Sequence, residues 1–589
     1  MLTTLTAPAF AGTWYIEDGD ITISAGKTEG TNKVTQGTTT DEEDTNTTIT
    51  NRDKDTPSSN TVTIKAENEN DKVEVKLEDV NIDASSRVNP SATTLNDTSY
   101  AAVNVTGKGD TNIELDGDNE LKSGRYRAGL EHNQTADSEG NVTSGKLTIQ
   151  DDKDNAGSLT ATGGESAAGI GGGNANAGQV TITGSNITAT GGYGSAGIGG
   201  GYGQISPNPN AGDGDVTISG GTIKAAGGTF GAGIGGGYIG DAHVTITGDA
   251  TVEEVQGGEG AAGIGSGAYA SIGEVEISGN AKIENAQGGI TGSGIGGGNG
   301  ASGTVVIKDD STVTATGGEA GAGIGGGIYG LSNVTIEGNT KVNATGGAGG
   351  AAIGGGAGAE NNSDNNGNQI TIKSNENGSP TINAVGGGTD EGEKIVIGGA
   401  GIGAGCESDA DADITLEGKV TITATAGKDN VAIGANGIEQ EFSGLAEGSS
   451  ITRYDSEGND TTLPTDPGYP VPAVPSSSGG GSADASVQES VFPGLVVTDK
   501  DGQRISYTSI RGNNVLSIRV GRFTASLRAS LATLRQLRAE GIDTITFQTI
   551  LCSTTLSVDE LLAMGGEDAE VVLTHHIRSS TLTVGGKAV

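Results

Sequence analysis

The chain has 589 residues, of which 107 are glycine and 3% are aromatic, and its formal net charge at neutral pH is −41. Arginine does not occur between Arg127 and Arg453, which excludes nucleic acid and phosphate ligands for that region because they need clustered Lys and Arg. Two cysteines cannot form a disulfide framework, and no apolar run reaches the roughly 20 residues of a membrane span.

The first residues end in Ala9-Phe10-Ala11, the small-x-small pattern that precedes a signal-peptidase site. We therefore expect residues 1–11 to be the remnant of an export signal, although its basic start and long apolar centre are missing. An ordinary polar N-terminus is the alternative. Together with the composition, the pattern predicts a secreted, extracellular protein, either free or associated with a cell surface.

Residues 12–120 contain short alternating segments, such as Val62-Thr63-Ile64 and Val73-Glu74-Val75, between polar loops. A solenoid needs a cover on its open end. We predict that this region forms an N-terminal cap and irregular first turns, with Trp14 covering the exposed core.

A repeat dominates residues 121–453, and its clearest copy is Ala168-Gly169-Ile170-Gly171-Gly172-Gly173. Most spacings between copies lie near 30 residues, which is typical of a solenoid. Leu130 is a degenerate first copy. The central isoleucine recurs as Ile170, Ile198, Ile234, Ile264, Ile295, Ile324, Ile353, Ile402 and Ile433.

Each unit also carries two alternating segments, such as 180–183 and 187–190, in which β-branched residues occupy every second position. This period of two predicts three strands per unit. Stacked units about 4.8 Å apart pair each strand with its copy and bury the apolar positions together. The sequence therefore predicts an all-β protein, a parallel β-helix of about ten or more turns.

The glycines of the third strand suggest a binding surface. If Ala168 and Ile170 face the core, Gly169 and Gly171 face outward, and their copies form a bare, flat strip that a ligand chain can approach closely. The alternative is that these glycines only form tight corners with positive φ.

Aromatic side chains follow the glycine run at matching positions and can stack on sugar rings. With Gly169 and Gly171 they make up the predicted carbohydrate-binding residues. The alternative is that they only cover the corner, because several units carry Asn or Ala there. The four aromatic candidates are Tyr202, Tyr238, Tyr269 and Tyr329.

Alternating carboxylates in a long insertion suggest a metal site, because calcium takes six to eight oxygen ligands and prefers carboxylates. A solvated acidic loop is the alternative. The candidate Ca²⁺ ligands are Glu407, Asp409, Asp411 and Asp413.

Catalysis is not expected. A calcium-dependent polysaccharide lyase needs a base beside its acidic ligands, and the repeats have no arginine and only scattered lysines such as Lys224 and Lys282. A glycosidase needs two carboxylates at a set separation, and in so acidic a chain any pair is unremarkable. Outward Thr-x-Thr pairs such as Thr188/Thr190 would suit ice binding, but other turns interrupt them.

Residues 454–490 are rich in Pro, then in Gly and Ser, and predict a linker. Residues 491–589 predict a small α+β domain, with a hairpin at Asp501-Gly502. We expect a helix that Thr524 caps and that ends at Gly541, followed by a shorter helix capped by Ser557. Strands are expected at 515–520, 545–547 and from 571. The domain's expected partner is a protein or the cell envelope.

The unit Val-Thr-Ile, Ile-Thr-Ala-Thr-Gly-Gly and Ala-Gly-Ile-Gly-Gly-Gly resembles exported β-helix proteins of Gram-positive anaerobes described as carbohydrate-binding-domain-containing. The resemblance covers residues 12–445 and implies glycan binding. The expected function is non-catalytic polysaccharide binding and surface adhesion. A purely structural stalk or adhesin and a calcium-dependent lyase are the alternatives.

Overall fold

The structure is a computed structural model in which two compact units divide the chain at residues 472 and 473. The described residues of the first unit are 11–94, 98–137, 139, 141–151, 157–204, 210–361, 367–388, 390–391, 394–395 and 398–469. Those of the second unit are 495–498, 504–505, 507–512, 514–520, 524–549, 553–564, 569–576 and 580–588. The predicted export-signal residues before Ala11 lie outside this set.

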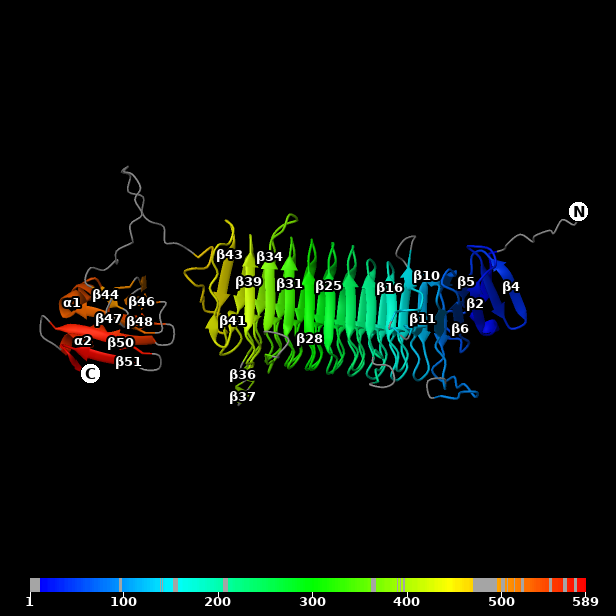
Figure 1. The fold of residues 1–589 in the computed structure, drawn as a ribbon, viewed down its shortest axis with the longest axis horizontal. Helices are drawn as coiled ribbons and strands as arrows, with labels where there is room; N and C mark the ends of the chain where they lie inside the picture. The colour runs from blue at the N-terminus through cyan, green and yellow to red at the C-terminus, as the bar shows by residue number, and fades with distance from the viewer. Residues whose placement is uncertain are drawn as a thin grey trace, which may run out of the picture. The chain divides into compact units, whose positions relative to one another are not determined.

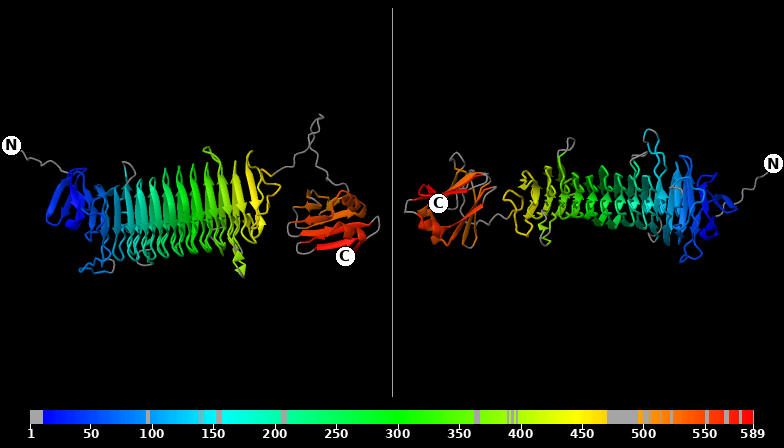
Figure 2. Two further views of the ribbon diagram at one scale, coloured as in Figure 1. Left: turned by 180° about the vertical axis from the view of Figure 1, so that it is seen from behind. Right: turned by 90° about the horizontal axis from the view of Figure 1, so that it is seen from below.

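The first unit is a parallel β-helix, as predicted, in which three sheets run along one rod (Figure 1). Strands of successive turns lie side by side, and the view from below shows the same ladder (Figure 2). In spatial order, the first sheet contains β1 (Thr13–Tyr15), β5 (Thr48–Thr50), β7 (Lys72–Glu78), β10 (Asp110–Asp116), β13 (Leu147–Gln150), β16 (Gly178–Ile182), β19 (Gly214–Ile218), β22 (Ala242–Ile246), β25 (Ile272–Ile277), β28 (Ser302–Ile307), β31 (Ser332–Glu337), β34 (Asn368–Lys373) and β39 (Ala412–Glu417).

The other two sheets follow the same order along the rod. The second sheet contains β8 (Asn81–Asp83), β11 (Asp118–Lys122), β14 (Ser158–Thr162), β17 (Asn186–Thr190), β20 (Thr222–Ala226), β23 (Thr251–Gln256), β26 (Lys282–Gln287), β29 (Thr312–Thr316), β32 (Lys341–Thr345), β35 (Thr381–Val385), β40 (Thr421–Thr425) and β43 (Ser450–Tyr454). The third sheet contains β4 (Thr39–Asp44), β3 (Asn32–Gln36), β2 (Ile21–Ala25), β6 (Val62–Ala66), β9 (Val103–Gly107), β12 (Leu130–His132), β15 (Ile170–Gly171), β18 (Ile198–Gly199), β21 (Ile234–Gly235), β24 (Ile264–Gly265), β27 (Ile295–Gly296), β30 (Ile324–Gly325), β33 (Ile353–Gly354), β38 (Ile402–Gly403), β41 (Ile433–Ala435) and β42 (Ile438–Glu439).

The isoleucine repeat forms a single column inside the rod. Ile170 pairs with Ile198 and with Leu130 in the neighbouring turns, and the pairing continues without a shift to Ile433. Every isoleucine of the column is fully buried. The predicted inward positions of the other strands, such as Val180 and Ile182, are buried with them. Stacked, in-register turns therefore build one continuous core.

The N-terminal end of the rod is closed by antiparallel strands. β3 pairs antiparallel with β2 and with β4, beyond the last parallel turn, and a short 3-10 helix, η1 (Ile16–Asp18), precedes β2. Trp14 is buried in the core, and its indole Nε1 donates a hydrogen bond to Asp44 at 2.9 Å. The expectation that Trp14 covers the core end is confirmed. Parallel stacked strands already occur within residues 12–120, where β1 pairs with β5 and β2 with β6.

The C-terminal end is closed around a buried arginine. Arg453 on β43 takes the register position of the inward Ala424 and is fully buried. Its guanidinium donates two hydrogen bonds to Asp466, at 2.7 and 2.9 Å, and pairs with Glu439. The fold therefore continues beyond residue 453, because Asp466 is itself buried.

The longest spacing in the repeat, between Ile353 and Ile402, contains an inserted hairpin. Its strands β36 (Asp390–Glu391) and β37 (Lys394–Ile395) pair antiparallel and project from the rod (Figure 1). The insertion leaves the isoleucine column intact, since β33 still pairs with β38.

The second unit is an α+β domain with its own apolar core. One sheet orders its strands as β44, β47, β50, β51 and β52, and the other as β45, β46, β48 and β49. Its elements are β44 (Leu495–Thr498), β45 (Thr508–Gly512), β46 (Val515–Arg519), β47 (Ala525–Ser530), α1 (Leu531–Ala539), β48 (Thr544–Gln548), β49 (Ser553–Ser557), α2 (Val558–Ala563), β50 (Glu570–His575), β51 (Ser580–Val584) and β52 (Lys587–Ala588).

The predicted helix from Thr524 is wrong in its first turns. Residues 525–530 form strand β47, and α1 begins at Leu531 with Ser530 as its N-cap, whose hydroxyl accepts a hydrogen bond from the Thr533 amide. The predicted Ser557 cap of α2 is confirmed. The Asp501-Gly502 turn lies outside the described residues, although Thr498 and Arg504 beside it pair antiparallel.

Of the helices that the structure describes, none is long and apolar enough to cross a membrane.

Candidate functional site: the corner edge of the solenoid

Two corner loops flank each short strand of the third sheet. We call the loop before the strand the leading corner, for example residues 257–261, and the loop after it the trailing corner, for example 266–270. Backbone hydrogen bonds join them between turns, since the Asn299 amide donates to Gly260 at 2.7 Å and the Ala268 amide to Phe230 at 3.0 Å. Together the two rows of corners form one edge of the rod, the corner edge.

The prediction of a bare strip at Gly169 and Gly171 is wrong. Both residues are buried, and a Cβ on Gly169 would lie 2.7 Å from the carbonyl oxygen of Gly197 in the next turn. Gly171 has a φ of +126°, which favours glycine because it has no Cβ. The corner alternative therefore holds for Gly171, and neither residue is placed to touch a polysaccharide.

A different row of glycines lies on the corner edge. In each leading corner the second glycine of the Gly-Gly pair stacks on its copy in the turn before, so closely that a Cβ would overlap that copy's carbonyl oxygen. We call this row the glycine ladder. Its members are Gly164, Gly192, Gly228, Gly258, Gly289, Gly318, Gly347 and Gly387. The signal is visible in the sequence as the Gly-Gly pair of each unit.

Three of the predicted tyrosines belong to one aromatic cluster on this edge. The rings of Tyr202 and Tyr238 stack at 5.0 Å with an interplanar angle of 15°. The ring of Tyr269 meets Tyr238 edge-on at 5.9 Å. Burial raises the pKa of Tyr202, and the neighbouring tyrosines raise it further.

Sequence reasoning missed two members of the aromatic cluster, Tyr193 and Phe230, which come from the leading corners. Tyr193 lies 6.2 Å from Tyr202, and Phe230 lies 5.7 Å from both Tyr193 and Tyr238. The outer rings remain accessible, since Tyr193 is 50% and Tyr269 58% exposed. The cluster therefore offers ring surfaces at both of its ends.

Tyr329 is exposed but lies apart from the aromatic cluster. It has nearly the same backbone φ as Tyr269, 63° against 62°, because both occupy the positive-φ position of a trailing corner. Its ring lies over Gly358 of the next turn, and the ring contacts within the described residues do not include it.

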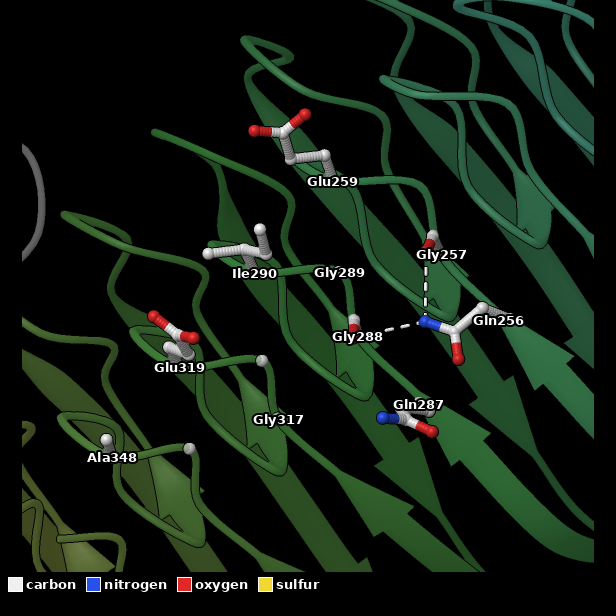
Figure 3. Close-up of a pocket in the computed structure, with 12 residues that line it drawn as sticks. Gln256, Gly257, Glu259, Gln287, Gly288, Gly289, Ile290, Gly317, Glu319 and Ala348 are labelled. Atoms are coloured by element: carbon white, nitrogen blue, oxygen red, sulfur yellow. Dashed lines mark hydrogen bonds between the residues drawn. The ribbon is translucent and has the colours of Figure 1, made fainter. Parts of the chain in front are cut away.

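A groove runs along the leading corners of the turns that follow the aromatic cluster (Figure 3). We call it the corner groove. It has a volume of ≈ 480 Å³ and lies over part of the glycine ladder. Gly260, which follows the lining residue Glu259, is next to Phe230 and Ala268. Its lining residues are Gln256, Gly257, Glu259, Gln287, Gly288, Gly289, Ile290, Gly317, Gly318, Glu319, Gly347 and Ala348.

The four proposed calcium ligands are not brought together. Glu407, Asp409, Asp411 and Asp413 are all exposed. The side chain of Asp411 accepts long hydrogen bonds, at 3.4 Å, from Asn361 and Asn436. No group of three His, Cys, Asp or Glu that could hold a metal gathers within the described part of the chain. Calcium binding stays an untested prediction, and the geometry favours the solvated loop.

One carboxyl near the corner edge makes stability depend on pH. Burial raises the pKa of Asp213 from 3.8 to about 7, the charge of Asp241 adds to this, and His243 opposes it. The folded protein then holds a proton that the unfolded chain releases, so stability falls as pH rises from 3.8 to about 7. Asp213→Asn should remove this pH-dependent loss in the free energy of unfolding, which amounts to at most about 4 kcal/mol. The asparagine side chain keeps an oxygen that can accept the hydrogen bond from the Asp241 amide.

Urea unfolding of Asp213→Asn and the unchanged protein across this pH range checks the prediction. The advantage of the variant should appear above pH 4 and level off near pH 7. A constant difference at every pH would contradict it.

Four segments of the first unit match a family model described as Beta helix repeat, at residues 155–174, 180–202, 216–238 and 305–328. Searches of curated proteins and of solved structures find no match. Two matched segments end at Tyr202 and Tyr238, so the matched repeats include half of the predicted tyrosine row. With the three stacked sheets, the match identifies the chain as a parallel β-helix repeat protein.

Proposed function

We propose that this protein is an extracellular, non-catalytic polysaccharide-binding protein whose ligand lies along the corner edge. The observation that carries the proposal is the aromatic cluster, which places accessible rings from consecutive turns beside the corner groove. Aromatic rings present a flat apolar face to a sugar ring, and tyrosine adds a hydroxyl.

The shape of the edge supports a long ligand. The corner groove crosses several turns and is open along the rod, since its floor consists of glycines without side chains. Turns repeat at about 4.8 Å, so equivalent groups recur at a fixed spacing. A polymer of identical units can use such a surface, whereas a small ligand would contact only one or two turns.

Binding should depend on Tyr269 and much less on Tyr329. These residues share a corner position and a backbone φ, and both are exposed, at 58% and 64%. Only Tyr269 belongs to the aromatic cluster, so Tyr269→Ala should weaken binding by roughly tenfold, the effect of about 1–2 kcal/mol of ring stacking. Tyr329→Ala is the matched control.

A glycan array identifies ligands for the full chain, and affinity electrophoresis in gels containing the selected polysaccharide then compares the two variants. Equal retardation of Tyr269→Ala and the unchanged protein would contradict a role for the aromatic cluster. No retardation by any polysaccharide would contradict the proposed function and would favour the second candidate, a structural stalk. The unbroken isoleucine column supports that candidate, because it makes a regular rod.

A further inference from the structure

The outer wall of the corner groove alternates in chemistry from turn to turn. The residue after each ladder glycine is Glu259, then Ile290, then Glu319 in three consecutive turns. All three side chains are exposed and stand on the corners above the groove (Figure 3). Two carboxylates with one apolar side chain between them therefore line the groove.

The inner wall supplies neutral hydrogen-bonding groups. Gln256 and Gln287 stand in register on adjacent strands of the second sheet. The Gln256 amide nitrogen donates to the carbonyl oxygens of Gly257 at 3.1 Å and Gly288 at 3.4 Å, which holds this side chain against the groove floor. Amide groups can both donate to and accept from the hydroxyl groups of a sugar.

The charge of the groove selects among polysaccharides. Of the described residues that line it, none is basic, and the whole chain carries −41. A polymer of sugar carboxylates would meet like charge at Glu259 and again at Glu319. A polymer that carries protonated amines would instead pair with Glu259 and Glu319, since charged hydrogen bonds are the stronger ones.

The spacing fits such a polymer. Two turns separate Glu259 from Glu319, which is roughly 10 Å at the stacking distance of parallel strands. In a β-1,4-linked chain each sugar is turned over relative to the last, so the same group faces one side at every second sugar. The disaccharide repeat of the extended chain has nearly this length, and the intervening sugar would face Ile290.

We propose that the corner groove binds an extended, β-1,4-linked polysaccharide whose sugars carry protonated amino groups. Glu259 and Glu319 each pair with one amine, Ile290 contacts the sugar between them, and Gln256 and Gln287 bond to hydroxyls. The inference rests on the proposed polysaccharide binding and names its class of ligand.

Calorimetry with the full chain tests the inference with two probes, a hexamer of β-1,4-linked glucosamine and the N-acetylated hexamer of the same length. The free-amine hexamer should bind more tightly, and added salt should weaken its binding. Glu259→Gln and Glu319→Gln should each weaken it roughly threefold, and the double variant about tenfold, as expected for exposed ion pairs. Glu376→Gln, which removes an exposed carboxylate outside the groove, should bind as the unchanged protein does.

Equal binding of the two hexamers, or unchanged binding by the double variant, would overturn the amine inference and leave polysaccharide binding in place. Failure of both hexamers while another glycan binds through Tyr269 would overturn this inference alone. Absence of binding to every glycan would overturn both proposals.

Discussion

Replacing Arg453 by Met should destabilise the C-terminal turns of the solenoid by about 3–5 kcal/mol. The guanidinium is fully buried, and its two hydrogen bonds to Asp466 compensate a carboxylate whose side chain is 0% exposed. Methionine fills the space but leaves the charge of Asp466 without its partner. An uncompensated buried charge costs far more than the ion pair contributes.

Arg52→Met is the matched control at the other end of the rod. Arg52 also binds a carboxylate with two hydrogen bonds, both at 2.6 Å to Asp18, but it is 51% exposed. Urea unfolding and hydrogen exchange of β43 should show a much larger loss for Arg453→Met than for Arg52→Met. A similar loss in both variants would refute the view that the buried arginine closes the core. Adding Asp466→Leu to Arg453→Met should restore part of the stability.

Replacing Gly318 by Ala should cost about 3 kcal/mol or more, because the added Cβ would overlap the carbonyl oxygen of Gly289. The backbone cannot easily move away, since the Gly318 amide donates to Gly292 and its carbonyl accepts from Gly321, both at 3.0 Å. The methyl group would also narrow the corner groove, whose floor includes Gly318.

Gly300→Ala separates this overlap from backbone strain. Gly300 has a φ of +77° and no neighbour within 4 Å of an added Cβ. It occupies the corner position of Tyr269 and Tyr329, which adopt positive φ with large side chains, so alanine there should cost only about 1–2 kcal/mol. Thermal unfolding compares the two variants. If Gly300→Ala were as damaging as Gly318→Ala, close stacking of the glycine ladder would not be the cause.

The core could be predicted from the sequence because its signal is strictly periodic. Ile170 and its copies recur once per turn, and Val180 and Ile182 alternate with threonines. Both patterns are expected for any stack of parallel strands and do not depend on the conformation of the corner loops. The buried isoleucine column and the three sheets follow directly from them.

The exposed surface of the third strand could not be predicted in this way. The strand is only two residues long, Ile170–Gly171, and Gly171 already has a positive φ. Alternation of faces requires extended backbone on both sides of a residue, which is missing here. The glycines that line the groove instead belong to the Gly-Gly pair of the leading corner.

Three of the five members of the aromatic cluster could be predicted from the sequence. Tyr202 and Tyr238 stand one repeat apart and are found in contact. Tyr193 and Phe230 belong to the other row of corners, and only the folding of the chain around each turn brings them to the same edge. They precede the glycine run in sequence, whereas the predicted tyrosine row follows it, so matching positions after the run did not include them.

In the second unit, the helical spacing of three leucines led to a predicted helix that begins too early. Leu527, Leu531 and Leu534 are spaced as one face of a helix, but Leu527 lies on β47 and pairs with Leu573 and Val497. All are buried in the same core. Ser530, a good N-cap residue, marks the true start of the helix.

The dependence of affinity on ligand length tests whether the corner edge binds a polymer across several turns. From Tyr193 to Ala348 the aromatic cluster and corner groove span six turns, roughly 24 Å between the first and the last. For oligosaccharides of a bound glycan, calorimetry should show affinity that rises with length until the chain covers this distance and then levels off. A disaccharide that binds as tightly as the longest oligosaccharide would contradict the account.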